Sequence, residues 1–230
     1  DLSEKFNVAS IGEAGENLVK YAAIMNDLHR AAGRCGVGAV MGSKKLKAIA
    51  VRGTQKIPIA EPGNFQEISK KQFELLNESI LAAGLTAYGT NLVLDMVNVC
   101  AGLPTRNWQT GVCPFADDIN GEALSEKVFV KQTGCFACPI ECGRVSEIRN
   151  GPNTGKKGEG PEYETIYAFG GLCLINSIEE IAYLNDVCDR LGIDTITAGN
   201  LCAFTIEAAR QGRIDYKIEY GDVDAIAKLL

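Results

Sequence analysis

Histidine is almost absent from this 230-residue chain, which contains only His29. A zinc site built on a histidine pair is therefore excluded, and no second C-x2-C motif is present to build one from cysteines alone. The chain also has no apolar run long enough to predict a membrane span and nothing that resembles a secretory signal. Its net charge is −6 and it lacks the basic clusters of a nucleic-acid-binding surface, so we expect neither nucleic acid nor membrane as a partner.

Cysteine, by contrast, is abundant, with nine residues. Cys135, Cys138 and Cys142, here called the cysteine trio, form a C-x2-C-x3-C run between Gly134 and Gly143. Three thiolates on one short loop are the arrangement that holds three corners of an iron–sulfur cube. A zinc knuckle and unrelated buried thiols are the alternatives. The odd count and uneven spacing do not indicate a disulfide framework, so we expect metal-bound thiolates in a reducing, cytoplasmic environment.

The composition, with 46% hydrophobic and 23% charged residues, is typical of a globular protein with one or two domains. Prolines and a glycine in residues 56–64 predict a domain boundary. Before it we expect a helix over 13–28 and a short strand within 46–53. The predicted fold class is mainly α: a helical domain over 59–230, preceded by a short α/β part over 1–58. The resemblance described below implies that this part is a remnant of a β-rich cofactor-binding domain.

Beyond the boundary the sequence predicts an almost wholly helical structure. An apolar stripe predicts one amphipathic helix over 65–84, ended by a glycine. Ser177 with Glu180 has the pattern of a capping box and predicts a helix over 178–191. A further helix is expected over 195–211, again followed by a glycine.

The ends of the chain suggest part of a longer polypeptide. The sequence opens on Asp1 rather than Met, and it stops at Leu230 inside an apolar-periodic segment. We therefore expect any site that needs further sequence to look incomplete here.

Residues 30–44 are dense in glycine, with four within ten positions. The dinucleotide fingerprint G-x-G-x-x-G is not matched, because Met41 occupies its last position, and the order of residues 42–44 does not fit a phosphate loop. Two interpretations remain. The backbone, flanked by Arg30 and Arg34, presses its N–H groups against a large anionic ligand, or the segment is a tight turn with solvated arginines.

Two acidic segments are candidates for ligand binding or proton transfer. Asp189 and Asp194 lie at a helix–helix junction opened by Gly192, where a carboxylate could accept the paired N–H groups of a pterin. Helix capping by Asp194, with Asp189 on a solvated face, is the alternative. Glu162 and Glu164 precede an apolar stretch and could handle protons if desolvated near a metal; acids in this position also favour the dipole of a following helix.

Taken together, several motifs resemble the aldehyde:ferredoxin oxidoreductase family. They follow one another nearly from end to end of the chain: AGENLVKYAAIMND, RAAGRCGVGAVMGSKKLKAIAVRG, LPTRNW, CFACPIEC, GPEYET and DRLGID. Members of this family are tungsten (sometimes molybdenum) enzymes with a bis-pterin cofactor and one 4Fe–4S cluster. In these terms residues 1–58 resemble the end of the N-terminal pterin-binding domain, and residues 59–230 most of the helical middle domain.

The resemblance implies a role for each motif. The cysteine trio would ligate the cluster, with a fourth cysteine expected beyond Leu230. Glu164, and after it Glu162, looks like the active-site acid beside the metal. The implied pterin contacts are Arg30, Ala31, Ala32, Gly33, Arg34, Cys35 and Gly36 in the glycine-rich segment, and Asp189, Ile193 and Asp194 at the helix junction.

The implied reaction is the two-electron oxidation of a small aldehyde to a carboxylic acid, with ferredoxin as the electron acceptor. Glu164 would take or position the proton of the attacking water. His29 is not assigned the role of the family's active-site histidine, which is expected in missing C-terminal sequence. The Glu-x-x-His motif that holds a metal between subunits in some members is absent, so a dimer site of that kind is doubtful. A homo-oligomer, or a complex with electron-transfer subunits, stays open.

Two rival functions are considered. The tungsten subunit of benzoyl-CoA reductases is similar in its glycine-rich segment and cysteines, but the GPEYET stretch favours aldehyde oxidation. A non-catalytic iron–sulfur electron-transfer module would explain the cysteines and leave the other motifs without a role.

Overall fold

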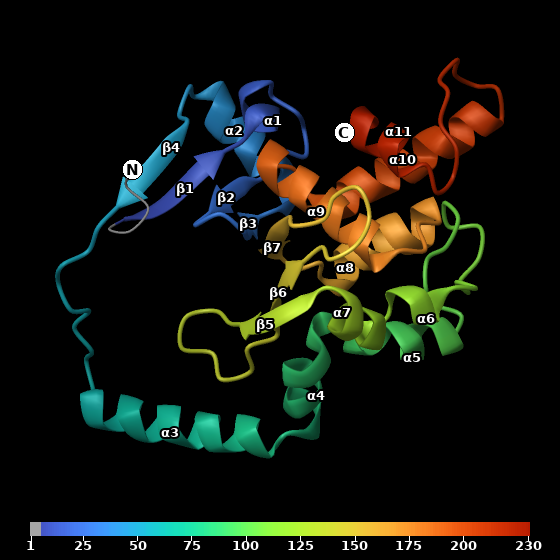
Figure 1. Cartoon of the computed structure of the whole chain (residues 1–230). Coiled ribbons are helices and arrows are strands. Elements are labelled where there is room, and N and C mark those ends of the chain that lie inside the picture. The colour runs from blue at the N-terminus through green and yellow to red at the C-terminus, as the bar shows by residue number, and fades with distance from the viewer. Residues whose placement is uncertain (1–5) are drawn as a thin grey trace.

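The computed structural model describes residues 6–230 and is mainly helical with two small sheets, which confirms the predicted fold class (Figure 1). The first sheet is antiparallel with strand order β3-β2-β1-β4. Its strands and the helical turns between them are β1 (Asn7–Ile11), α1 (Glu13–Glu16), β2 (Ile24–Asn26), β3 (Arg30–Ala32), the 3-10 turn η1 (Arg34–Gly36), α2 (Val37–Ser43) and β4 (Ala48–Val51).

Residues 52–61 contain no helix or strand and lead into the larger, helical part of the molecule. Its first helices are α3 (Pro62–Glu78), α4 (Ile80–Tyr88), the 3-10 segment η2 (Gly89–Val93), α5 (Leu94–Val99), α6 (Ala116–Ile119) and α7 (Gly121–Lys127). A second antiparallel sheet has the order β5 (Phe129–Thr133), β6 (Gly143–Glu147) and β7 (Lys157–Glu159). The remaining elements are α8 (Tyr163–Ile166), the π-helical turn η3 (Tyr167–Gly171), α9 (Ile178–Leu191), α10 (Thr195–Arg210) and α11 (Val223–Leu229).

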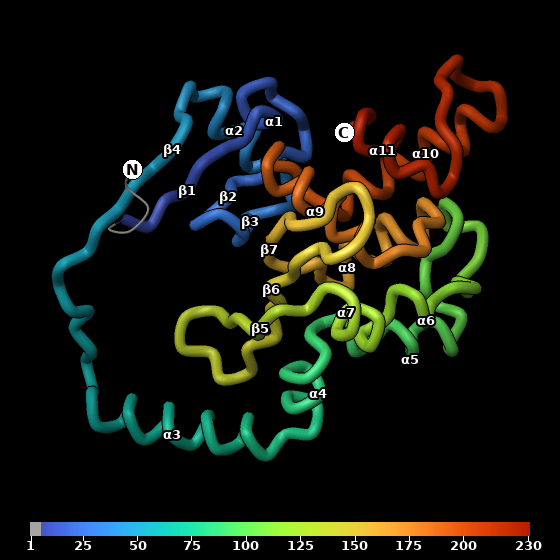
Figure 2. The backbone as a smooth tube through the Cα atoms, in the orientation of Figure 1, coloured from blue at the N-terminus to red at the C-terminus, as the bar shows by residue number. Residues whose placement is uncertain are grey.

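The main core lies where η3, α9 and α10 pack together, and fully buried apolar side chains such as Phe169 and Ile181 fill it. The first sheet lies beside the end of α9 (Figure 2), and backbone hydrogen bonds join the two. Ala23 N donates to Gly192 O at 2.7 Å, and a Cβ on Gly12 would lie only 2.2 Å from Leu191 O. These contacts place the glycine-rich segment beside the helix junction, so two of the predicted cofactor-binding elements meet.

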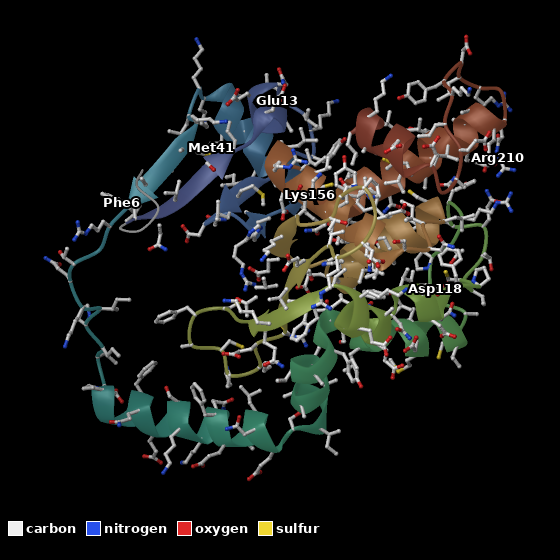
Figure 3. The ribbon with its side chains drawn as sticks, viewed as in Figure 1. Phe6, Glu13, Met41, Asp118, Lys156 and Arg210 are labelled. Atoms are coloured by element: carbon white, nitrogen blue, oxygen red, sulfur yellow. The ribbon has the colours of Figure 1, made fainter. Side chains whose placement is uncertain are left out.

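Helix α3 stands away from the rest of the structure, and its side chains project outward along its whole length (Figure 3). None of its residues is buried. The structure splits the helix predicted over 65–84 in two: α3 ends at Glu78, and Ser79 Oγ accepts from Ala82 N at 3.3 Å to begin α4. Gly84 lies inside α4 and does not end a helix. A capping serine overrides the continuing apolar stripe.

One helical stretch, Ile80–Val99, is long and apolar enough to cross a membrane by length and composition alone. It is weak evidence for a membrane segment, because core helices of water-soluble proteins meet the same criterion. The stretch also bends at Gly89, whose φ is 66°, and it contains the buried amide of Asn91, which donates to Ile119 O at 2.9 Å.

Three further predictions about local structure are wrong. The helix expected over 13–28 is a single turn, α1, followed by strand β2, because β2 pairs with both β1 and β3 and this tertiary pairing outweighs a helical pattern. The glycine-rich segment, expected as a loop, contains β3, η1 and α2. The part beyond residue 58 is not almost wholly helical, because β5, β6 and β7 occupy residues 129–159. The domain limits at residue 58 stay a prediction.

The predicted strand within 46–53 and both later helices are confirmed. Ser177 Oγ accepts from Glu180 N at 3.3 Å, and α9 ends at Gly192, whose left-handed backbone (φ 70°) suits a glycine. Asp194 Oδ2 accepts from Thr197 N at 2.9 Å and caps α10. The ends of α9 and the start of α10 therefore follow directly from cap residues in the sequence.

Candidate functional site

The cysteine trio lies on the loop that joins β5 to β6. Ala137 (φ 56°) and Glu141 (φ 49°) have left-handed backbone, and Cys138 N donates to Cys135 O at 3.0 Å, so the loop turns back on itself. The Cys135 side chain is exposed and the other two are partly buried. Burial raises the pKa of the Cys142 thiol.

A guanidinium connects this loop to the first sheet. Arg30 Nη1 lies 3.7 Å from Cys135 Sγ, and Arg30 Nη2 lies 2.5 Å from Glu159 Oε1, although Arg30 and Cys135 are 105 positions apart in the sequence. A Cβ on Gly143 would lie 2.9 Å from the same carboxylate oxygen, so the glycine after the trio gives Glu159 its room. Through Arg30, the glycine-rich segment is thus in direct contact with the cysteine loop, as two adjoining cofactor sites would require.

Glu162 lies on the cysteine side of this contact. Its carboxylate is hydrogen-bonded to the Thr90 hydroxyl, which in turn accepts from Tyr163 N at 3.0 Å. Burial raises the pKa of Glu162, the hydrogen bond from Thr90 opposes that rise, and the neighbouring Glu159 charge adds to it. Burial is the largest of these influences, so the pKa of Glu162 lies above its ordinary value.

The glycines of the glycine-rich segment serve close backbone packing more than ligand approach. A Cβ would lie 2.2 Å from Lys20 O on Gly36, 2.4 Å from Ala23 O on Gly38 and 1.9 Å from Gly15 O on Gly42. Gly33 differs, because the only atom near its Cβ position is Asp194 Oδ1 at 3.5 Å, an ordinary contact distance. Residues 36–42 are therefore closely packed against other backbone segments, and residues 30–35 form an exposed or half-exposed edge. Ligand binding by this edge stays a prediction.

The helix junction brings Ile193 and Asp194 against this edge. Ile193 is buried and pairs with Ala22, and Asp194 N donates to Tyr21 O at 3.1 Å. Asp194 Oδ2 caps α10 while its Oδ1 points toward Gly33. Helix capping and ligand binding are therefore compatible, because the carboxylate uses a different oxygen for each.

Asp189 is not on a solvated face. Its side chain is 17% exposed, and its Oδ2 lies 3.5 Å from His29 Nδ1 and accepts from Asn185 Nδ2 at 3.3 Å. Burial raises the pKa of Asp189 to about 7, with contributions from the charges of Asp186 and Glu159. Asp189 and His29 border a cavity of about 1000 Å³ lined on its other side by β1, which is large enough for a cofactor.

Glu164 lies in the first turn of α8, two residues after Glu162. Its side chain is exposed and close to Tyr167, whose pKa is raised first by burial and then by the Glu164 charge. Arg34, from the glycine-rich segment, is near enough to Tyr167 to oppose that rise. Glu164 and Arg34 therefore both lie close to Tyr167, which is itself buried.

The residues present fit an iron–sulfur cluster by their donor chemistry. Three thiols on one turning loop are soft ligands of the kind that iron–sulfur clusters use. Within residues 6–230, no group of three or more histidine, cysteine, aspartate or glutamate side chains is already arranged to hold a metal ion. The exposed edge of Arg30–Cys35, facing Asp194, fits a large anionic cofactor in the same way.

Several site residues had no role in the sequence-based predictions. Arg144, fully buried, donates to Leu85 O at 3.1 Å and Thr86 O at 2.6 Å and packs over the Phe129 ring beside Glu162. Thr90 was not predictable, because only the fold brings it to Glu162. Trp108 belongs to the LPTRNW motif, which contributed to the family resemblance but predicted no role for the tryptophan itself.

Comparison with known proteins gives the family. A family model described as "Aldehyde ferredoxin oxidoreductase, domains 2 & 3" matches residues 67–230, and one for the N-terminal domain of the same enzyme matches residues 1–53. The chain belongs to the aldehyde ferredoxin oxidoreductase family.

Curated relatives agree with this assignment. The chain is 48% identical over 221 residues to the tungsten-containing aldehyde ferredoxin oxidoreductase of Pyrococcus furiosus, covering 96% of this chain and 36% of that protein. It is 48% identical over 211 residues to the enzyme of the same name from Thermococcus kodakarensis, covering 91% and 34%. It is 33% identical over 229 residues to the aliphatic sulfonate oxidoreductase WOR-like subunit of P. furiosus, covering 96% and 36%. The chain thus spans about a third of the length of these relatives.

A solved structure shares the fold. The active-site complex BamBC of benzoyl coenzyme A reductase, in complex with 1,5-dienoyl-CoA, matches with a TM-score of 0.74 and 20% sequence identity, covering 97% of this chain and 36% of that one. At this identity the likeness concerns the fold alone.

Proposed function

We propose that this protein, in the cytoplasm, oxidises small aldehydes to carboxylic acids at a tungsten or molybdenum bis-pterin centre and passes the electrons through a 4Fe–4S cluster to ferredoxin. The observation that carries the proposal is the contact of Arg30 with both Cys135 Sγ and Glu159. It joins the implied pterin edge to the implied cluster loop, which is the adjacency that electron transfer between two such groups needs. The 46–48% identity to tungsten-containing aldehyde ferredoxin oxidoreductases supports it.

The chain's own residues have distinct tasks in this proposal. When bound, the cofactors supply the two-electron and one-electron redox chemistry. Arg30 and Arg34 provide positive charge along the exposed edge, and Asp189 and Asp194 provide carboxylate oxygens that can accept paired N–H groups of a pterin. The cysteine trio supplies three cluster ligands.

Proton handling is assigned to Glu164 first. Its side chain is exposed and lies close to Tyr167 and Arg34, so a substrate can reach its carboxylate. There it accepts or positions the proton released when water adds to the aldehyde. Glu162, half-buried and close to Cys142, is the second candidate for proton handling.

The two rivals receive less support. Likeness to a benzoyl-CoA reductase subunit is limited to the fold at 20% identity, whereas the aldehyde ferredoxin oxidoreductases match at more than twice that value. A simple electron-transfer module does not account for the open edge at Gly33 that faces Asp194, or for the cavity beside Asp189.

The test is aldehyde-dependent reduction of benzyl viologen by the anaerobically purified, intact protein. Viologen reduction with simple aldehydes, and its loss in Glu164→Gln with metal content retained, is the expected result. The benzoyl-CoA reductase alternative would be supported by a different result. The protein would then contain iron together with tungsten or molybdenum, reduce no viologen with any aldehyde, and transfer electrons to an aromatic acyl-CoA. Iron without tungsten or molybdenum would support the electron-transfer module.

A further inference from the structure

Three consecutive residues, Arg106, Asn107 and Trp108, have left-handed backbone with φ values of 47°, 47° and 64°. None is glycine. Each such residue is strained relative to right-handed backbone, because its Cβ approaches the following carbonyl oxygen. A run of three persists only where surrounding contacts determine it, and strain of this kind clusters at functional sites. The turn therefore needs an explanation beyond chain reversal.

The turn is fixed to the π-helical segment η3. Arg106 N donates to Gly171 O at 2.9 Å, and Asn107 N donates to Leu172 O at 3.1 Å. A Cβ on Gly171 would lie 2.3 Å from Pro104 O, so only glycine permits this approach. π-Helical turns are themselves frequent at functional sites. Two unusual backbone segments thus support each other beside Tyr167, the first residue of η3.

What the turn holds in place is the indole of Trp108. Its Nε1 donates to Asn200 Oδ1 at 2.9 Å, and its ring meets the Tyr167 ring edge-on at 6.4 Å between centroids. Tyr163 continues the set, with its ring 5.7 Å from that of Tyr167. Trp108 nevertheless stays 61% exposed. An aromatic side chain that is oriented by a hydrogen bond, placed by strained backbone and left unburied has the character of a binding surface.

This aromatic set adjoins the proposed active-site acid. Tyr167 has Glu164 and Arg34 as its charged neighbours, and Tyr163 directly precedes Glu164 in the chain. A substrate whose reacting carbon lies near Glu164 can therefore place its side chain against the exposed ring of Trp108, which Tyr167 supports from the buried side.

We propose that Trp108 is a specificity-determining residue: its exposed indole face, backed by Tyr167, forms an aromatic wall that packs the side chain of the aldehyde and selects aromatic aldehydes over acetaldehyde. The proposal rests on the proposed function. The wall contributes binding to the ring of the substrate and takes no part in the transfer of protons or electrons.

The test compares kcat/KM for benzaldehyde and acetaldehyde in the intact holoenzyme and in Trp108→Ala and Trp108→Phe. For Trp108→Ala we expect a loss of about tenfold or more with benzaldehyde, mainly through KM, and of less than about threefold with acetaldehyde. Trp108→Phe should restore most of the selectivity. Phe73→Ala, which removes an exposed aromatic ring from α3, is the matched control and should leave kcat/KM unchanged for both aldehydes.

A binding measurement makes the test independent of turnover. Trp108 is the one tryptophan of this chain, so benzoate should quench a fluorescence component that is present in the wild type and absent from Trp108→Phe. The proposal would be overturned if kcat/KM fell equally for both aldehydes in Trp108→Ala. It would also be overturned if quenching by benzoate did not differ between wild type and Trp108→Phe. If Trp108→Ala does not fold, Trp108→Leu and Trp108→Phe decide by the same ratio. A wild type that oxidises neither aldehyde but shows the Trp108-dependent quenching would contradict the proposed function and leave the wall standing.

Discussion

Glycine, at the scale of single residues, serves two purposes in this chain. Gly36, Gly38 and Gly42 let backbone segments approach within distances that no Cβ allows, whereas Gly33 leaves ordinary space in front of Asp194. The glycine density of the sequence therefore predicted close backbone approach correctly but could not distinguish a protein partner from a ligand. That distinction needs the positions of Lys20, Ala23 and Gly15, which only the fold supplies.

Gly42→Ala tests this packing role. Alanine favours a helix interior by about 1 kcal/mol, but its Cβ would lie 1.9 Å from Gly15 O, so the backbone of α1 or α2 must shift. We expect a net loss of about 2 kcal/mol in the free energy of unfolding, measured from urea transitions. Gly53→Ala is the control, since no atom lies within 4 Å of its Cβ position, and it should change stability by less than about 0.5 kcal/mol. Equal effects of the two substitutions would contradict the packing role.

Asp189 gives a pH dependence with a definite sign. With a pKa of about 7 in the folded protein and 3.8 as its ordinary value, it holds a proton between these pH values that the unfolded chain has lost. The free energy of unfolding is therefore highest below about pH 4. It falls as the pH rises to about 7, by about 4 kcal/mol at most. His29, Asp186 and Glu159 face the same carboxyl.

Asp189→Asn should remove most of this decline. The amide resembles the protonated acid, so the variant should match the wild type near pH 4 and exceed its stability at pH 8 in the cofactor-free protein. Urea midpoints measured at the two pH values provide the comparison. Parallel pH profiles for variant and wild type would mean that burial does not perturb Asp189 in this way.

At the scale of elements, cap residues predicted structure better than apolar periodicity did. Ser177, Gly192 and Asp194 fix the ends of α9 and α10, because each satisfies backbone groups locally. The helix expected over 13–28 failed because Ile24–Asn26 finds backbone partners on two neighbouring strands, which a local pattern does not reveal. The strands between residues 129 and 159 were missed for the same reason: their pairing follows from the fold around the cysteine loop.

Ser177→Ala tests the cap of α9. The substitution removes the side-chain acceptor for Glu180 N and should lower the free energy of unfolding by about 1 kcal/mol. Ser177→Thr keeps a hydroxyl that can accept the same bond and should recover most of the loss. Thermal melts of the three proteins measure the difference; a stability unchanged in Ser177→Ala would show that the cap is dispensable.

The whole molecule brings together motifs that the sequence separates by more than a hundred positions. Sequence reasoning identified the cysteine trio, the glycine-rich edge and the helix junction individually, and the resemblance to a family assigned them roles. It could not predict that Arg30 connects two of them, since the contact depends on how the first sheet sits against α9 and the second sheet. The assignments of Glu164, Glu162 and the pterin contacts stay predictions.

Arg30→Gln tests the connection between the two proposed cofactor sites. The wild-type guanidinium places positive charge 3.7 Å from Cys135 Sγ, and such charge favours the reduced form of a thiolate-ligated cluster. The midpoint potential of the cluster, followed by EPR in a redox titration, should therefore fall in Arg30→Gln and stay near the wild-type value in Arg30→Lys. A potential that is the same in all three proteins would show that Arg30 does not act on the cluster.

The central claim is that this chain helps to hold an iron–sulfur cluster directly beside a tungsten or molybdenum pterin centre. Metal analysis of the anaerobically purified, intact protein tests it most directly. The account predicts about four iron atoms for each atom of tungsten or molybdenum, and loss of the iron in Cys138→Ser. Zinc in place of iron, or iron with neither heavy metal, would contradict it.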